Sequence, residues 1–275
     1  MSLNNVEKFK AKMDKGQICI GTCISAPDPC VSELFADTGY DFTWIDTEHN
    51  PLSGRDTLGH VMAARGTDLA PLVRVPWNDP VLIKPILEFE PAGIIIPLIR
   101  TAADAELAVK ACKYPPRGIR GYGPGRGVGF GAINTQDYLK DADSKIMVIV
   151  QVEHIDAVNN LDAILDTPDL DAVALGPNDL SGSLGMLGQS ENPEVAKHLD
   201  SAAKKVRDKG LYLGVATGYS PENVKRWIDK GVQWMSLNGD YANLYLQTKT
   251  VVNGAKAVIE NIECIYSEQS FKKME

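Results

Sequence analysis

The sequence predicts a single (β/α)8 TIM barrel, in which eight parallel strands alternate with helices. Eight short runs rich in β-branched and other apolar residues alternate with stretches of helical periodicity, a pattern typical of right-handed βαβ units and a parallel sheet. The composition stays even along the 275 residues, and no low-complexity segment or linker marks a domain boundary. We therefore expect one domain over residues 1–275, because a chain of this length accommodates the eight βα units of a closed barrel.

The eight predicted strands are short and separated by helical stretches. The last two helical stretches, "PEVAKHLDSAAKKVRDKG" and "SPENVKRWIDKG", begin with a polar residue or proline and end in a basic residue and glycine. A doubly wound open sheet is the alternative fold. It is weakened because "RGYGPGRGVGFG", residues 120–131, lacks the G-x-G-x-x-G spacing of a dinucleotide site. In chain order, we expect strands at 18–25, 42–49, 71–76, 93–99, 146–153, 171–176, 212–217 and 233–238.

Residues 241–275 follow the eighth predicted strand and form a longer segment than one closing barrel helix needs. They predict an extended C-terminal helix and tail. Its spare apolar residues need a surface to pack on, either on their own barrel or on a neighbouring subunit. We favour the neighbour and therefore expect a homo-oligomer. The residues concerned are Leu244, Leu246, Val251, Val252, Val258, Ile259 and Ile262.

The bulk composition is that of a soluble globular protein with a sizeable core, 44% hydrophobic and 23% charged. A net charge of −8 argues against nucleic acid or an anionic membrane as the partner. No apolar run reaches the length of a transmembrane helix, and the charged start "MSLNNVEKFKAKMDKG" is unlike a signal peptide. The five cysteines form no C-x-x-C, which indicates reduced thiols and a cytoplasmic location.

Polar side chains gather where the predicted strands end, and in an α/β barrel the carboxyl ends of the strands carry the chemistry. Alternation puts Gln151 and Glu153 on one face of their strand, with Val150 and Val152 on the other. If the valines pack on helices, the polar pair faces the barrel mouth. The candidates at the strand ends are Asp46, Glu48, His49, Arg74, Gln151, Glu153, Asn178 and Asp179.

Glu153 and Asp179 come from neighbouring strands, and two such carboxylates indicate a hard divalent cation such as Mg²⁺. Each candidate also has a structural interpretation. Glu153 could be the buried ion-pair partner of Arg74, and Asp179 could cap a short helical turn. His49 could be a structural hydrogen-bonding residue.

Other residue types restrict the chemistry further. The four histidines lack the spacing of zinc ligands, and we expect His60 and His198 at the surface. No predicted strand contains a lysine, which disfavours a Schiff-base mechanism.

Several motifs, taken together and in order, resemble the HpcH/HpaI aldolase family over about residues 16–250. They are "WIDTEHNP", "VRVPWNDPVLIKPIL", "GIIIPLIRTAADA", "KYPPRGIRGYGPGR", "VIVQVEH", "LGPNDLSGSLG" and "GVATG". The resemblance implies a (β/α)8 barrel that binds Mg²⁺, Mn²⁺ or Co²⁺ and splits or forms a C–C bond beside a pyruvate unit. It also implies hexamers built from dimers that exchange a C-terminal helix.

The resemblance assigns roles by position. Glu153 and Asp179 would ligate the metal, and Arg74 would face the enolate oxygen of pyruvate. His49 would act as the acid/base, directly or through a water. Gln151 would position pyruvate, and the backbone N–H groups of Asn178 and Asp179 would receive its carboxylate. Asp46 would support a metal-bound water.

Two stretches depart from the family pattern. The family usually reads "LDxGA" where this chain has "LEFEPAG". The resemblance implies that Glu88 takes the place of an aspartate that supports the catalytic histidine across a subunit contact. Glu90-Pro91 replaces Gly-Ala in the same stretch. Asn50 stands where a small residue often follows His49.

The glycine-rich loop "KYPPRGIRGYGPGR" is expected to lie over the mouth as a lid or lining element. Its Arg117, Arg120 and Arg126 could contact an acidic substrate, or they could be solvated or lie between subunits.

The favoured function is therefore a metal-dependent aldolase that converts 4-hydroxy-2-oxo acids to pyruvate and an aldehyde. A related metal-enolate decarboxylase or lyase on the same fold is the first alternative. A non-catalytic metabolite-binding barrel is the second, and the combination of His49, Arg74, Glu153 and Asp179 argues against it, because a binding protein needs no acid/base. The expected partners are a small 2-oxo acid, an aldehyde and further copies of the chain.

Overall fold

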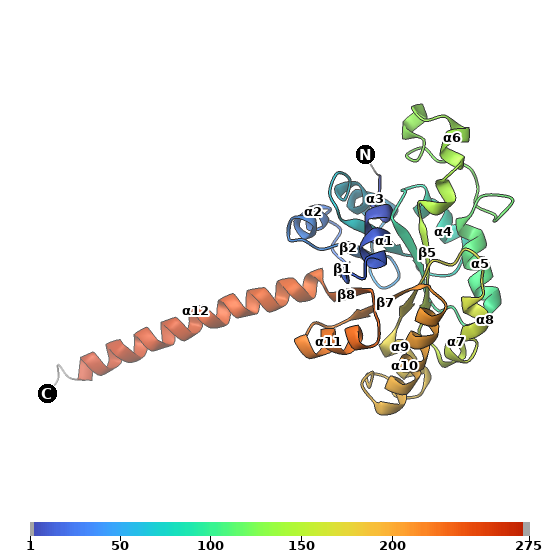
Figure 1. Cartoon of the computed structure of the whole chain (residues 1–275). Helices are drawn as coiled ribbons and strands as arrows, with labels where there is room; N and C mark the ends of the chain where they lie inside the picture. The colour runs from blue at the N-terminus through green and yellow to red at the C-terminus, as the bar shows by residue number, and fades with distance from the viewer. Residues whose placement is uncertain (1–2, 272–275) are drawn as a thin grey trace.

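The chain folds into a closed barrel of parallel strands surrounded by helices, which confirms the predicted fold class (Figure 1). The computed structural model describes residues 3–271, with side chains as far as residue 262. Each strand pairs with its neighbours in chain order, and the eighth pairs with the first to close the sheet. The strands are β1 (Cys19–Ile24), β2 (Phe42–Asp46), β3 (Ala70–Arg74), β4 (Gly93–Ile96), β5 (Met147–Val152), β6 (Ala172–Leu175), β7 (Tyr212–Thr217) and β8 (Trp234–Gly239).

The helices surround the sheet, and one precedes the first strand. In chain order they are α1 (Val6–Asp14), α2 (Cys30–Asp37), α3 (Gly54–Ala63), α4 (Pro80–Leu87), α5 (Ala102–Cys112), α6 (Thr135–Leu139), α7 (Ile155–Asn159), α8 (Leu161–Leu165), α9 (Pro177–Ser183), α10 (Pro193–Asp208), α11 (Pro221–Asp229) and α12 (Asp240–Phe271), with short 3-10 turns at Gly129–Gly131 and Ala142–Ser144. Ser53 and Thr101 begin α3 and α5 with capping boxes, which satisfy backbone donors that a helix start leaves open.

The strands alternate between two hydrophobic layers, as their period of two residues requires. One layer fills the barrel interior and includes Trp44, Ile149 and Trp234, and α1 closes its amino-terminal end with Phe9. The other layer lies between the strands and the helices and includes Val150 and Val152, among many others. Gln151 and the following Glu153 therefore lie on the interior face, as the alternation predicts.

The interior positions change from apolar to polar towards the carboxyl ends of the strands. Trp44 is followed two residues later by Asp46, Leu72 by Arg74, and Ile149 by Gln151. A buried polar group needs a partner, so these side chains pair with one another at this end. The mouth, which we define as the end of the barrel formed by the carboxyl ends of the strands, is thus where the candidate residues meet.

The prediction that the glycine-rich loop lies over the mouth is wrong for its own barrel. The loop follows α5, and α5 runs from the mouth back to the amino-terminal end of the sheet. There Gly127 and Tyr138 line a pocket together with Asn4 and Val6 from the start of the chain. Sequence order places the loop after the fourth strand, but the intervening helix carries it to the opposite end of the barrel.

The helix α12 extends away from the barrel as one long rod and does not fold back on it (Figure 1). Its apolar residues are accordingly exposed, among them Leu244, Val251 and Ile259. In the part of the chain that the structure describes, no helix combines the length and the apolar composition needed to cross a membrane.

Candidate active site

Arg74 and Asp46 form a two-point ion pair at the ends of the neighbouring strands β3 and β2. Arg74 Nε donates to Asp46 Oδ1 at 2.9 Å, and Nη2 lies 2.8 Å from Oδ2. The guanidinium also lies over the Trp44 ring, 5.4 Å from its centroid. Two parallel contacts and a stacked ring fix the plane of the guanidinium, which a single contact would leave free to rotate.

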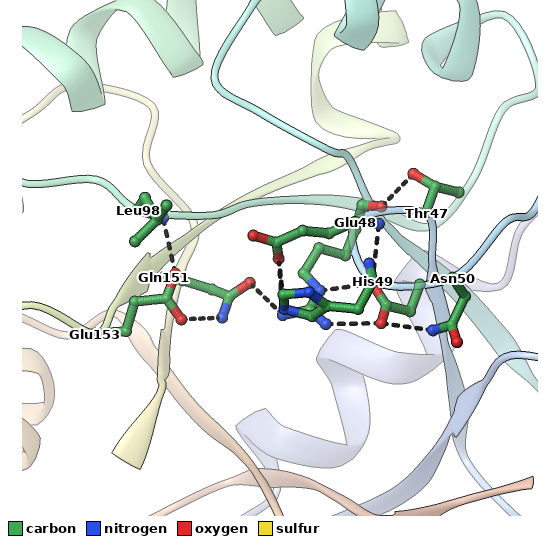
Figure 2. Close-up of polar contacts among 9 residues, drawn as sticks. Thr47, Glu48, His49, Asn50, Leu98, Gln151 and Glu153 are labelled. Atoms are coloured by element: carbon green, nitrogen blue, oxygen red, sulfur yellow. Dashed lines mark hydrogen bonds and ion pairs between the residues drawn. The ribbon is translucent and has the colours of Figure 1, made fainter. Parts of the chain in front are cut away.

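A chain of polar contacts continues from Arg74 across the mouth to the fifth strand. Arg74 Nη1 donates to Gln151 Oε1 at 3.4 Å, and Gln151 Nε2 donates to Glu153 Oε2 at 2.7 Å. The other oxygen of Glu153 accepts the backbone N–H of Leu98, which follows β4, at 2.8 Å (Figure 2). Leu98 has a φ of 53°, a left-handed conformation that directs this N–H towards the carboxylate.

Glu153 is a deeply buried carboxylate, with 3% of its surface exposed. Burial, the largest cause, raises its pKa to about 7, and the negative charges of Asp179 and Glu48 act in the same direction. Gly176, which follows β6, makes room for it, since a Cβ there would lie 2.5 Å from both Cβ and Oε2 of Glu153. The glycine is therefore required by the packing of the carboxylate.

His49 lies in the turn that follows β2, and its side chain is 62% exposed. Its Nε2 is 3.6 Å from Glu48 Oε2, and that same oxygen is 2.9 Å from Arg74 Nη1. Burial raises the pKa of Glu48, and the nearby carboxylate of Asp46 adds to the effect. Glu48 thus connects the exposed histidine with the buried arginine (Figure 2).

Three carboxylates influence one another at this site, those of Glu48, Glu153 and Asp179. Such crowding of negative charge is unfavourable unless a cation or protons balance it. Among the side chains that the structure describes, residues 3–262, no three His, Cys, Asp or Glu residues are already arranged as a complete metal-ligand group. Two carboxylates with room for water are nevertheless the donor set that Mg²⁺ and similar ions accept, so these residues fit such an ion.

The sequence of the chain matches the sequence model of a protein family. The model described as HpcH/HpaI aldolase/citrate lyase matches residues 21–243. The chain belongs to this family. The family resemblance stated from the motifs is thereby confirmed.

Several relatives similar to this chain are named as aldolases. A hydroxypyruvate/pyruvate aldolase of Roseobacter denitrificans is 34% identical over 245 residues, which cover 88% of this chain and 94% of that protein. A 4-hydroxy-2-oxo-heptane-1,7-dioate aldolase of Shigella sonnei is 33% identical, covering 84% and 88%. The crystal structure of an HpcH/HpaI aldolase from Desulfitobacterium hafniense has a TM-score of 0.84 and 29% identity, covering 90% and 96%. These similarities support a carbon–carbon lyase activity of the aldolase type.

The structure brings most of the predicted residues of this family member to one place. Asp46, Arg74, Gln151 and Glu153 form a continuous network, and Asp179 lies in the first turn of α9, directly after β6. The structural alternatives for Glu153 and Asp179 are not observed. The ion pairs of Arg74 are with Asp46 and Glu48 rather than with Glu153, and α9 begins after Gly176, so Asp179 is not its N-cap.

Glu88 does not lie beside His49 of the same chain. It follows α4 at the amino-terminal end of the barrel, where its Oε1 is 3.6 Å from Arg120. The suggested support of His49 by Glu88 thus requires a second subunit and stays a prediction. Arg120, which the sequence offered as a possible contact for an acidic substrate, is buried between Glu88 and Glu90 instead.

Two site features received no role from the sequence. Glu48 was noted at the strand end, but its contacts with Arg74 and His49 make it part of the network. Its spacing of two residues from Asp46 could have indicated this. The backbone N–H of Leu98 had no signal, because every residue except proline carries one.

The expectation that His60 is a surface residue is wrong. The side chain is fully buried, with Nδ1 2.8 Å from Ser32 Oγ and Nε2 2.9 Å from the carbonyl oxygen of Ala26. On α3, His60 faces inward together with Thr57, three residues before it, and Val61, the residue after it. That helical spacing was a usable signal for burial.

Proposed function

We propose that the protein is a divalent-metal-dependent aldolase that cleaves 4-hydroxy-2-oxo acids into pyruvate and an aldehyde, and joins the two in reverse. The observation that carries the proposal is the continuous network from Asp46 through Arg74 and Gln151 to Glu153, with His49 beside it. An arginine with a fixed plane, a crowded set of carboxylates and an exposed histidine suit the formation of an enolate next to a carboxylate.

Glu153 and Asp179 are the proposed ligands of Mg²⁺, Mn²⁺ or Co²⁺, an ion that, when bound, polarises the keto group of the substrate as a Lewis acid. Gln151, which holds one oxygen of Glu153, would keep that carboxylate in place and orient pyruvate. The backbone N–H groups of Asn178 and Asp179 lie in the first turn of α9, where a helix leaves them without partners of its own, and would receive the pyruvate carboxylate.

Arg74 would donate to the keto oxygen, which gains negative charge as the enolate forms. A donor already held in position stabilises such charge without reorganising, and this is the larger part of its value. Asp46 and Glu48 hold the guanidinium in that position. Asp46 would also support a water on the metal.

His49 would move the proton, directly or through a water. In cleavage it takes the proton from the 4-hydroxyl group while the bond between C3 and C4 breaks and its electrons form the enolate. The proton then goes to C3 and yields the methyl group of pyruvate. Its exposed ring is accessible to the substrate, and Glu48 lies 3.6 Å from Nε2. Such acid/base catalysis typically contributes a factor of roughly 10²–10⁴.

The working form of the protein is proposed to be a homo-oligomer in which residues 241–275 pack on a neighbouring subunit. A cavity of about 420 Å³ lies on the outside of the barrel where β8 meets β1, lined by Ile20, Tyr40 and Leu237 among others. The start of α12 contributes Asn243 to its lining, and the rest of that helix points away from the barrel (Figure 1). The exposed apolar residues of a second copy's α12 match this surface in character.

The test avoids any assumption about the aldehyde. Protein stripped of metal is incubated with pyruvate in D₂O, Mg²⁺, Mn²⁺ or Co²⁺ is added, and the methyl signal is followed by proton NMR. We expect metal-dependent loss of the signal through enolate formation, abolished in His49→Ala and Glu153→Ala. His198→Ala is the matched control, because His198 lies on α10 and pairs with Glu194.

Absence of exchange with all three metals, in folded protein, would overturn the proposed mechanism. Exchange without cleavage of any 4-hydroxy-2-oxo acid would overturn the aldolase assignment and leave enolate formation standing. Equal exchange rates in His49→Ala and His198→Ala would remove His49 from its role.

A further inference from the structure

The turn that carries His49 is built around the carboxylate of Asp46. Asp46 Oδ1 accepts the backbone N–H of Glu48 at 3.1 Å and that of His49 at 3.4 Å. Its other oxygen, Oδ2, accepts the side-chain amide of Asn50, with Nδ2 at 2.8 Å. The three residues after Thr47 are therefore all tied to one carboxylate, which is 2% exposed.

Asn50 closes this ring from the far side of His49. Figure 2 shows its amide directed towards the carboxylate, while the His49 side chain points into the site. Because Arg74 holds the same carboxylate at 2.8 and 2.9 Å, the ring is anchored to β3 as well as to β2. The turn is thus fixed before His49 by the strand and after it by the Asn50 side chain.

The backbone has to set the direction of the His49 ring, because the ring has little else to hold it. In the described part of the chain its polar contact is Glu48 at 3.6 Å, beyond hydrogen-bond length, and the side chain is largely exposed. A shift of the turn would move the imidazole directly. Displacement of a catalytic group by about 1 Å can cost roughly a hundredfold in rate.

We propose that Asn50 is a positioning residue, which fixes the turn that presents His49 by donating its amide to Asp46. The inference rests on the proposed function, since it concerns the histidine that moves the proton in that reaction. Asn50 itself touches neither Glu153 nor Arg74 among the contacts of the described residues, so its effect is transmitted through Asp46 and the turn.

The experiment compares Asn50→Ala with Asn50→Asp, which keeps the size and shape of the side chain but replaces the donor by an oxygen. We expect the rate of pyruvate methyl exchange and kcat for cleavage to fall about 10- to 100-fold in Asn50→Ala. The loss should be larger in Asn50→Asp, because two carboxylates then face each other. KM for pyruvate and the affinity for Mn²⁺ should change less than twofold. Asn159→Ala and Asn159→Asp are matched controls, because Asn159 is exposed at the end of α7.

The outcomes separate this inference from the function on which it rests. Wild-type exchange with an unchanged rate in Asn50→Ala overturns the role of Asn50 alone. A rate loss that matches the loss of Mn²⁺ affinity, or Asn50→Asp with wild-type activity, overturns it as well, because the first indicates a general structural defect and the second shows that no donor is needed. Absence of exchange in the wild-type protein overturns the proposed function and the role of Asn50 with it.

Discussion

Arg74 holds Asp46 through two separate nitrogens, Nε to Oδ1 at 2.9 Å and Nη2 to Oδ2 at 2.8 Å. The pair joins the ends of β2 and β3, and the contacts to Glu48 and Gln151 start from its arginine. Its geometry depends on the planar fork of a guanidinium, which lysine does not possess.

Arg74→Lys is therefore expected to preserve the charge and lose the function. A lysine ammonium reaches one carboxylate at a time and cannot keep contact with Asp46, Glu48 and Gln151 together. Removal of one preorganised donor to a developing oxyanion typically costs about 10²–10³ in kcat. The check is the kcat of the variant from steady-state kinetics, and an unchanged melting temperature shows that the variant is folded. A variant that keeps more than a tenth of the wild-type kcat would contradict the assigned role of Arg74.

Gly176→Ala tests the fit between β6 and the Glu153 carboxylate. The added Cβ would lie 2.5 Å from Glu153 Oε2, closer than atoms can approach, so the carboxylate must turn away. We expect the affinity for Mn²⁺, measured by titration of its paramagnetic signal, to fall at least tenfold. Gly123→Ala is the control, since a Cβ at Gly123 meets nothing within 4 Å. Equal affinities in the two variants would show that Glu153 does not bind the ion.

Gly127→Ala tests how the glycine-rich loop is attached to the barrel. The loop packs on a buried cluster in which Tyr138 Oη donates to Glu90 Oε1 at 2.8 Å and Arg120 lies 3.6 Å from the same oxygen. A Cβ at Gly127 would be 2.5 Å from both Glu90 Oε1 and Tyr138 Cε2.

Overpacking of this kind typically costs about 1–3 kcal/mol in the free energy of unfolding. Urea denaturation measures it, with Gly125→Ala as the control in the same loop, because that Cβ would meet open space. If both variants unfold at the same urea concentration, Glu90 does not anchor the loop.

The residues that the sequence located correctly are those governed by strand period. Gln151 and Glu153 face the interior because alternation by two residues fixes the face once Val150 and Val152 pack on the helices. The period of a strand does not predict which loop residues are buried or which residues lie at a contact between subunits. Arg120 was offered as a substrate contact and is instead held between two carboxylates, a pairing set by how the glycine-rich loop meets α4.

His60 should make the stability of the protein depend on pH. Burial lowers the pKa of its imidazole below the ordinary value of 6.5, although the carbonyl of Ala26 partly offsets this. Above pH 6.5 both the folded and the unfolded chain carry a neutral ring. Below it the unfolded chain takes up a proton first, so stability falls with falling pH, by at most about 1.4 kcal/mol per pH unit, until the folded pKa is reached.

The measurement is the free energy of unfolding between pH 7.5 and 5 for the wild type and His60→Gln. The His60→Gln protein is expected to be less stable overall, because glutamine loses one of the contacts to Ser32 and Ala26. The glutamine side chain does not titrate. The wild-type curve is expected to fall more steeply below pH 6.5. Parallel curves would show that His60 does not titrate differently in the two states.

The exposed apolar face of α12 leads to a prediction about assembly. An isolated helix with this many exposed apolar residues needs a partner surface, and the cavity outside β1 and β8 is the surface that we propose for it. We expect Leu246→Glu combined with Ile259→Glu to shift the protein to a monomer, with a mass near 29.9 kDa by light scattering after size exclusion. Gln247→Glu combined with Asn253→Glu adds the same two charges on the same helix at exposed polar positions and should leave the oligomer intact. A wild-type chain that already runs as a monomer would contradict the packing of α12 on a neighbour, and with it the route by which Glu88 of one subunit could support His49 of another.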